Sequence, residues 1–170
     1  MITAGIRPGR RRLDAAALPD HLDRLYRAAY VLCGSREDAE DLVQETYERV
    51  LRRPRFLRND NDLAYLMRVL RNTFARAQGK HRSRPTTLMP TEDIEWVQDP
   101  EADPTGSVLE MRAAFAAIAT LSDPLRETIV AVDLVGLPYR EAAHALGVRE
   151  GTIMSRLHRA RERVAEALDG

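Results

Sequence analysis

The apolar residues of this chain recur every three or four positions, in blocks that a single long gap divides into two groups. Such spacing places side chains on one face of an α-helix, and no run of alternating β-branched residues indicates a sheet. Within the gap, Pro85, Pro90, Pro100 and Pro104 interrupt any helix. The pattern therefore predicts an all-α protein of two small helical domains joined by a flexible acidic linker.

The boundaries follow from where the spacing starts and stops. We expect a disordered basic arm over residues 1–17, helical domains over 18–84 and 108–170, and a linker over 85–107. Within the first domain, Gly34 ends one helix, and Ser35 with Asp38 resembles a capping box for the next.

Charge is distributed unevenly, although the chain is neutral as a whole. Residues 1–85 hold 18 Arg and Lys against 11 Asp and Glu, whereas residues 86–110 hold seven acids and no base. Residues 111–170 hold eight of each sign. Binding to phosphates depends on local charge, so a basic first domain is compatible with a nucleic-acid partner.

Other classes of protein are excluded or disfavoured by simple counts. No stretch approaches the roughly 20 apolar residues that cross a bilayer, so no membrane insertion is expected. The N-terminus lacks the apolar segment of a secretory signal, and the single Cys33 cannot form an internal disulfide. We therefore expect a cytoplasmic protein. No metal-ligand spacing such as H-E-x-x-H and no glycine-rich phosphate loop occurs, which predicts no enzyme, no catalytic residue, no metal and no cofactor.

The segment from Tyr139 to His158 has the residue types of a helix-turn-helix. Ala143 is small enough for two helices to cross, and Gly147 tolerates the positive φ of the turn. The second helix then turns a polar surface outward, toward a DNA major groove. From spacing alone, a helical hairpin with a solvated arginine face remains an equal alternative.

The identities of the residues in this region are more specific than their spacing. The strings Leu121–Glu127, Val135–Ala143 and Gly151–Glu162 closely resemble the domain that reads the −35 promoter element in extracytoplasmic-function (ECF) sigma factors. The resemblance implies that the DNA-facing residues are Arg149, Glu150, Thr152, Met154, Ser155, Arg156, His158 and Arg159. Met154 stands where the family often has a basic or polar residue.

A second resemblance lies in the first domain. The string Asp38–Val50 has an apolar face and an acidic face, which by itself is more often a solvated surface. It closely resembles the polymerase-binding segment of the same family, region 2. The resemblance implies contacts with the β′ clamp through Asp38, Asp41, Gln44, Glu45 and Glu48.

The third expected helix, with the string Tyr65–Asn72, resembles the family segment that melts and reads the −10 element. Arginines can follow a phosphate backbone, and an amide can bind an exposed base. The −10 candidates are Arg55, Phe56, Arg58, Asn59, Arg68, Arg71, Asn72, Arg76, Lys80 and Arg82. The other interpretation is that Phe56 belongs to the core and the arginines are solvated.

Together these resemblances, with both modules in family order, imply an ECF sigma factor. Its partners would be core RNA polymerase (the β′ clamp and the β subunit), promoter DNA and an anti-sigma factor, and it would associate with the nucleoid when active. The acidic linker would be either a tether or a segment that threads the polymerase. The alternatives are a helix-turn-helix regulator that binds duplex DNA without polymerase, and a structural adaptor. The first does not account for the Asp38–Val50 string.

Overall fold

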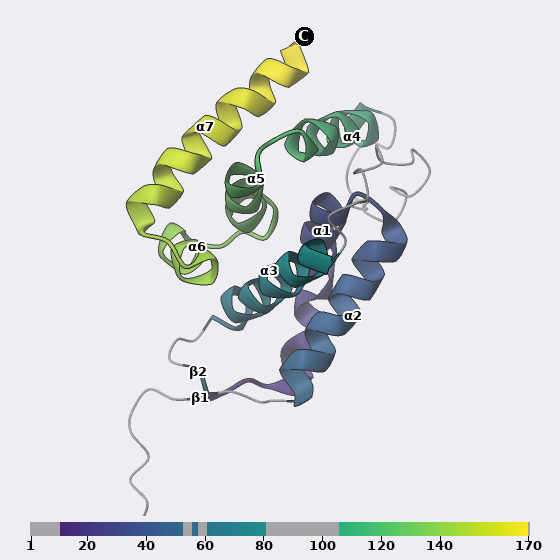
Figure 1. Ribbon diagram of the computed structural model, residues 1–170, viewed down its shortest axis with the longest axis vertical. Coiled ribbons are helices and arrows are strands. Elements are labelled where there is room, and N and C mark those ends of the chain that lie inside the picture. The colour runs from purple at the N-terminus through teal and green to yellow at the C-terminus, as the bar shows by residue number, and fades with distance from the viewer. Residues whose placement is uncertain (1–10, 53–55, 58–60, 81–105, 170) are drawn as a thin grey trace, which may run out of the picture.

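The computed structural model describes residues 11–52, 56–57, 61–80 and 106–169, in two helical modules (Figure 1). The first contains the 3-10 helix η1 (Ala15–His21) and the helices α1 (Leu22–Cys33), α2 (Arg36–Arg52) and α3 (Asp62–Lys80). The second contains α4 (Gly106–Ala119), α5 (Asp123–Ile129), the π-helical turn η3 (Val130–Leu134), α6 (Tyr139–Leu146) and α7 (Glu150–Asp169). The all-α prediction is confirmed, with one two-stranded addition described next.

The N-terminal arm is more ordered than its composition indicates. Arg11–Arg12 form strand β1, which pairs antiparallel with β2 (Phe56–Leu57), and Asp14 caps η1 by accepting a hydrogen bond of 2.9 Å from the Ala16 amide. Leu13 and Leu18 are buried. The prediction of a disordered arm is therefore wrong for residues 11–17, because these apolar side chains reach the core. Residues 1–10 lie outside the described part of the chain.

Three helices make the first module, since α1 and α3 both pack against α2 and against each other. The apolar stripes place their largest side chains in the shared core. Those with almost no exposed surface are Leu25, Tyr30, Val31, Val50, Leu66, Met67 and Leu70. Two leucines that fall within the apolar spacing of α1 and α2 are instead on the surface: Leu22 is 43% exposed and Leu51 is 53% exposed. Both lie at a helix end, where fewer neighbours cover a side chain.

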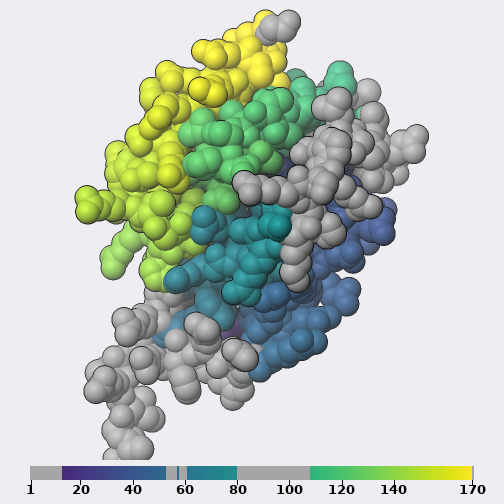
Figure 2. Space-filling model, in the orientation of Figure 1, coloured from purple at the N-terminus to yellow at the C-terminus, as the bar shows by residue number. Residues whose placement is uncertain are grey.

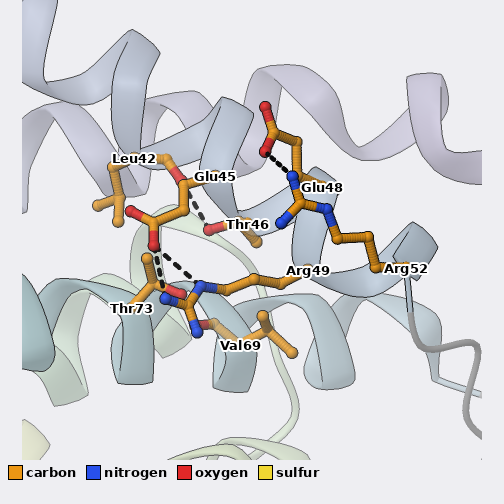
Figure 3. A network of polar contacts seen from close by, with 8 residues as sticks. All are labelled: Leu42, Glu45, Thr46, Glu48, Arg49, Arg52, Val69 and Thr73. Carbon is orange, nitrogen blue, oxygen red and sulfur yellow. Dashed lines mark hydrogen bonds and ion pairs between the residues drawn. The ribbon is translucent and has the colours of Figure 1, made fainter.

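Two buried threonines show how polar groups are accommodated between α2 and α3 (Figure 3). The Thr46 hydroxyl donates to the Leu42 carbonyl at 2.7 Å, and the Thr73 hydroxyl donates to the Val69 carbonyl at 2.9 Å. Each hydroxyl is thus satisfied within its own helix, which removes the free-energy cost of burying an unpaired donor.

The turn between α1 and α2 follows the expected chemistry. Gly34 has φ of +78°, which ends α1 in the left-handed region that glycine adopts without strain. The Asp38 amide donates to the Ser35 hydroxyl at 3.2 Å, and that hydroxyl donates to the Asp38 carboxylate at 2.8 Å. The Ser35 cap is confirmed, although Asp38 returns its bond to the hydroxyl rather than to the backbone, because its side chain is shorter than the usual Glu.

The two modules are packed against each other. Helix α3 contacts α6, and α1 contacts both η3 and α4. In Figure 2 the green and yellow-green atoms of the second module abut the teal atoms of α3. One contiguous group of buried apolar residues includes Leu25 and Leu66 of the first module together with Val130 and Ile153 of the second. The modules therefore share a core.

The cysteine Cys33 lies at the end of α1, where burial and the neighbouring Asp38 carboxylate raise the pKa of its thiol to about 12. Only the thiolate is nucleophilic. At pH 8 we expect Cys33 in the folded protein to react with a disulfide reagent about a thousandfold more slowly than in urea, where its pKa returns to about 9. Comparing the two rates by thiol titration checks this. Equal rates would contradict the burial of the thiol.

Among the described residues, no helix combines the length and the apolar character needed to span a membrane.

Candidate functional site

Helices α6 and α7 form the expected helix-turn-helix. Gly147 ends α6 with φ of +68°, and the Val148 amide donates to the carbonyl of the buried Ala143 at 3.0 Å. The amides of Thr152 and Ile153 then bind the Arg149 carbonyl, which starts α7. The roles predicted for Ala143 and Gly147 are confirmed by this geometry.

The outer face of α7 is largely open to solvent. Ile153, Leu157 and Ala160 are buried against the rest of the module. Thr152 and Arg156 are half-buried at the edges, and the remaining candidates for the −35 element are exposed: Arg149, Glu150, Met154, Ser155, His158 and Arg159. Met154 is 55% exposed, an unusual position for a large apolar side chain. All eight candidates thus lie together, in α7 or at the residue that precedes it.

Several of these side chains are held in place by their own helix. The Ser155 hydroxyl donates to the Thr152 carbonyl at 3.1 Å, and Arg159 Nε donates to the Ser155 carbonyl at 3.3 Å. His158 Nε2 lies 3.2 Å from a Glu162 carboxylate oxygen. All of these groups are exposed and can exchange such weak contacts for others.

Arg161, further along α7, is held by another element of the same module, η3. Its guanidinium donates two hydrogen bonds, of 2.6 and 3.0 Å, to the Asp133 carboxylate in η3. The hydrogen bond to Asp133 raises the pKa of Arg161, which stays charged. A two-pronged ion pair of this kind fixes direction as well as distance. Arg161 therefore orients α7 relative to η3 and does not extend the free basic surface.

The acidic face predicted on α2 is present. Asp38, Asp41, Gln44 and Glu45 are exposed and Glu48 is half-buried. Two of the acids are paired within the helix, as Figure 3 shows: Glu45 with Arg49 at 2.6 Å and Glu48 with Arg52 at 3.2 Å. Because these are exposed pairs spaced by four residues, each contributes only about 0.3–0.5 kcal/mol. Asp41 lies between Asp38 and Gln44 in the sequence of this face and is exposed.

A groove that the sequence did not indicate adjoins the acidic face, between α1 and α2. Its volume is about 520 Å³, and it is lined by Leu22, Asp23, Tyr26, Arg36, Glu40, Val43, Gln44 and Tyr47. The Tyr47 hydroxyl donates to the Leu18 carbonyl at 2.9 Å, and burial raises the pKa of Tyr47 to about 12, so it remains a neutral donor. The exposed Leu22 now has an explanation, because it forms part of an apolar wall beside Gln44.

The α3 candidates divide into two groups. Arg68, Asn72 and Arg76 are exposed and, spaced by four residues, follow one side of the helix. Arg71 instead turns toward the second module, where its Nε lies 3.1 Å from a carboxylate oxygen of Glu127 in α5. The side chain of Arg71 is 33% exposed and that of Glu127 is 14% exposed.

The other candidates for the −10 element are not placed. Arg55, Arg58, Asn59 and Arg82 lie outside the described residues, as does the 85–107 linker. Phe56 and Lys80 belong to β2 and α3, but their side chains are not described. The alternative of a buried Phe56 is therefore untested.

Fold and surface together define a two-module helical protein of the helix-turn-helix class. Residues 19–84 match the sigma-70 region 2 family, and residues 111–164 match the sigma-70 region 4 family.

The chain is 34% identical to the ECF RNA polymerase sigma factor SigE of Mycolicibacterium smegmatis, over 91% of this chain and 64% of SigE, so it spans less than two thirds of that relative. It is 33% identical to SigM of Mycobacterium tuberculosis, over 87% of this chain and 73% of SigM. Among solved structures it is similar to the sigma factor RpoE of Bartonella quintana in complex with the anti-sigma factor NepR, with a TM-score of 0.69, 29% identity, and coverage of 91% of this chain and 95% of RpoE. The chain belongs to the ECF RNA polymerase sigma factor family.

The sequence did not predict two features, the α1–α2 groove and the role of Glu127. The α1–α2 groove could not be predicted, because Leu22 continues the apolar spacing of α1, and that spacing by itself indicates a buried side chain. Glu127 was missed because it lies in a string that matches the family, Leu121–Glu127, without standing out as an isolated charge. Its partner is 56 residues away, and no local pattern reports such a contact.

Proposed function

We propose that this protein binds core RNA polymerase and directs it to specific promoters, with the first module reading the −10 element and the second reading the −35 element. The observation that carries the proposal is the pairing of two sigma regions in family order, each with its own exposed polar surface. A helix-turn-helix regulator would not need the module that matches region 2. The protein acts by binding rather than by catalysis, in the cytoplasm at the nucleoid.

The polymerase-binding surface is the acidic face of α2, directed at the β′ clamp. Charged rims of this kind steer and orient a partner, while apolar contact supplies affinity. The adjoining groove offers such contact, since Gln44 belongs to both surfaces and Leu22 stands exposed in the groove wall. Contact with the β subunit completes the attachment.

Promoter DNA is read by two kinds of contact. In α7, arginines and Ser155 are suited to base edges and phosphates of duplex DNA. In α3, Arg68 and Arg76 flank Asn72, a residue that can bind the edge of a base displaced from the duplex. Because RpoE of Bartonella quintana was solved with an anti-sigma factor, we also propose a protein inhibitor of that type for this chain.

The test is transcription in vitro from a fragmented genomic library, with core RNA polymerase in the presence and absence of the protein. We expect new start sites that share two sequence elements at a fixed spacing. If no new starts arise while the protein alone binds duplex DNA, the helix-turn-helix regulator is the better assignment.

Replacing Asn72 by Ala is expected to reduce promoter opening about tenfold while leaving affinity for the −35 element unchanged. The side chain is exposed on α3, so its loss removes a contact with a melted base and little stability. Permanganate reactivity of unpaired thymines measures the opening. Gln78→Ala is the matched control, because it removes an exposed amide from the same helix. Equal opening by Asn72→Ala and wild type would remove Asn72 from the −10 surface.

A further inference from the structure

The start of α7 contains two residues whose identity the packing of the described residues does not require. Gly151 is the second residue of this helix, and Met154 follows three positions later. Gly151 is exposed and Met154 is 55% exposed, whereas Ile153 between them is fully buried. Helix α7 lies along the edge of the second module in Figure 1, so its outer face is accessible to a partner.

Gly151 is an unfavourable choice for a helix, because the backbone of glycine loses more conformational freedom on folding than that of other residues. A glycine is usually explained by a positive φ or by a Cβ that would collide with a neighbour. The φ of Gly151 is not in the left-handed region, and a Cβ added there would meet no atom of the described residues within 4 Å. The fold therefore does not need this glycine, and the space beside it opens to the outside.

Met154 borders this space. Residues three positions apart share a face of a helix, and a helical side chain leans toward the N-terminus, over the turn that precedes it. The Met154 side chain is therefore directed over Gly151. A single exposed apolar side chain is ordinary on a protein surface. Its place beside a glycine without an internal role is less so, because the two together form an apolar surface where a partner can come close to the helix backbone.

The charge beside this Gly151–Met154 surface favours base edges over phosphates. Glu150 is exposed one turn before Met154, and its carboxylate repels the phosphates of a DNA backbone. The first residues of the second helix in a helix-turn-helix are also those that contact base edges in the major groove. There, the group that suits an apolar side chain is the C5-methyl of thymine.

We propose that the Gly151–Met154 surface packs on the C5-methyl group of one thymine in the −35 element, and that Met154 thereby selects the base pair at that position. The inference rests on the proposed function only in that the second module reads duplex DNA. Gly151 lets the methyl-bearing base edge approach the helix backbone, and Met154 covers the methyl group. Burying one methyl group corresponds to about a fourfold change in affinity.

The experiment begins by selecting a DNA element from duplexes with a randomised centre. The full chain is used in two arms, by itself and together with core RNA polymerase. Each thymine of the selected element is then replaced in turn by uracil, which lacks only the C5-methyl group. Fluorescence anisotropy of the labelled duplex measures the affinity of wild type and Met154→Ala. The control is Leu168→Ala, which shortens another exposed apolar side chain of α7.

We expect one thymine at which uracil lowers the affinity of wild type about fourfold, and at which Met154→Ala binds thymine and uracil equally well. Leu168→Ala should keep the sensitivity of wild type to uracil. Met154→Arg should prefer guanine at the same position, because arginine pairs with the O6 and N7 atoms of guanine.

Gly151→Ala separates a role in DNA binding from a role in folding. Alanine is the better helix former, so the variant should resist urea at least as well as wild type while it binds the selected element about fivefold or more weakly. A variant that loses stability and keeps its affinity would show that Gly151 serves the fold, and the close approach to the helix backbone would be wrong.

The contact is overturned by an element without any A·T pair, by wild-type affinity that no uracil changes, or by a Met154→Ala variant as sensitive to uracil as wild type. The two arms separate these outcomes from failure of the proposed function. New transcription starts without an effect of uracil keep the sigma activity and remove the contact. An element selected only by the protein alone, with a uracil effect that depends on Met154, keeps the contact and removes the sigma activity. If neither arm selects an element, both are wrong.

Discussion

Replacing Asp41 and Glu45 together by arginine is expected to weaken binding to core RNA polymerase by about a hundredfold or more. Both side chains are exposed on the same face of α2, and reversing a complementary charge at an interface costs several kcal/mol. The cost to folding is small, because the pair lost between Glu45 and Arg49 is exposed. Fluorescence titration of labelled protein with core polymerase measures the affinity.

The matched control reverses Glu162 and Glu166, which have the same spacing on α7 and are also exposed. It should leave polymerase affinity within about threefold of wild type, because it makes an equal change in net charge on the other module. If both double variants weaken binding equally, the effect would come from net charge and the α2 face would not be the docking surface.

Replacing Leu157 by Ala is expected to lower the free energy of unfolding by about 2–5 kcal/mol. Helix α7 is anchored by the buried residues Ile153, Leu157 and Ala160. Leu157 has only 2% of its surface exposed. Truncation leaves a cavity under the recognition helix. Urea denaturation followed by circular dichroism measures the change.

Leu168→Ala is the control, since it removes the same atoms from the same helix at a position that is 48% exposed. Its effect should stay within about 0.5 kcal/mol. A similar loss for both variants would mean that Leu157 and Leu168 are equally packed, contrary to their different burial. A normal stability for Leu157→Ala would mean that the module collapses around the cavity without cost.

The acidic face of α2 stays open to solvent although the two modules are packed together. The acidic face and its groove lie on α1 and α2, while the second module covers α3 and part of α1. Asp41 and Gln44 are therefore exposed although the two modules are packed together.

Much of the fold could be predicted from the sequence because its determinants are local. The spacing of Leu63, Leu66, Met67 and Leu70 specifies a helix and its buried side, and all four are buried in α3. Gly147 marks the turn of the helix-turn-helix because a positive φ excludes most other residues. The exposure of Met154 and Arg159 follows from the same periodicity.

The failures of the prediction all involve contacts between distant parts of the chain. Residues 11–17 look like a polar arm in the sequence. In the structure Arg11 and Arg12 pair with strand β2, and Leu13 is buried in the core. Leu22 reads as core until α1 and α2 leave a groove beside it. Charge and apolar spacing along one segment contain no information about which other segment will cover it.

The sequence by itself determined the helices, their turns, the buried face of each and the membership of both modules in the sigma-70 regions. Local steric and hydrogen-bonding rules act within a few residues, so they can be read in chain order. Only the tertiary structure decided that the modules share a core, that Arg71 faces Glu127 and that Arg161 is tied to Asp133. The two ion pairs join residues that are 56 and 28 positions apart, and their formation depends on how whole helices pack.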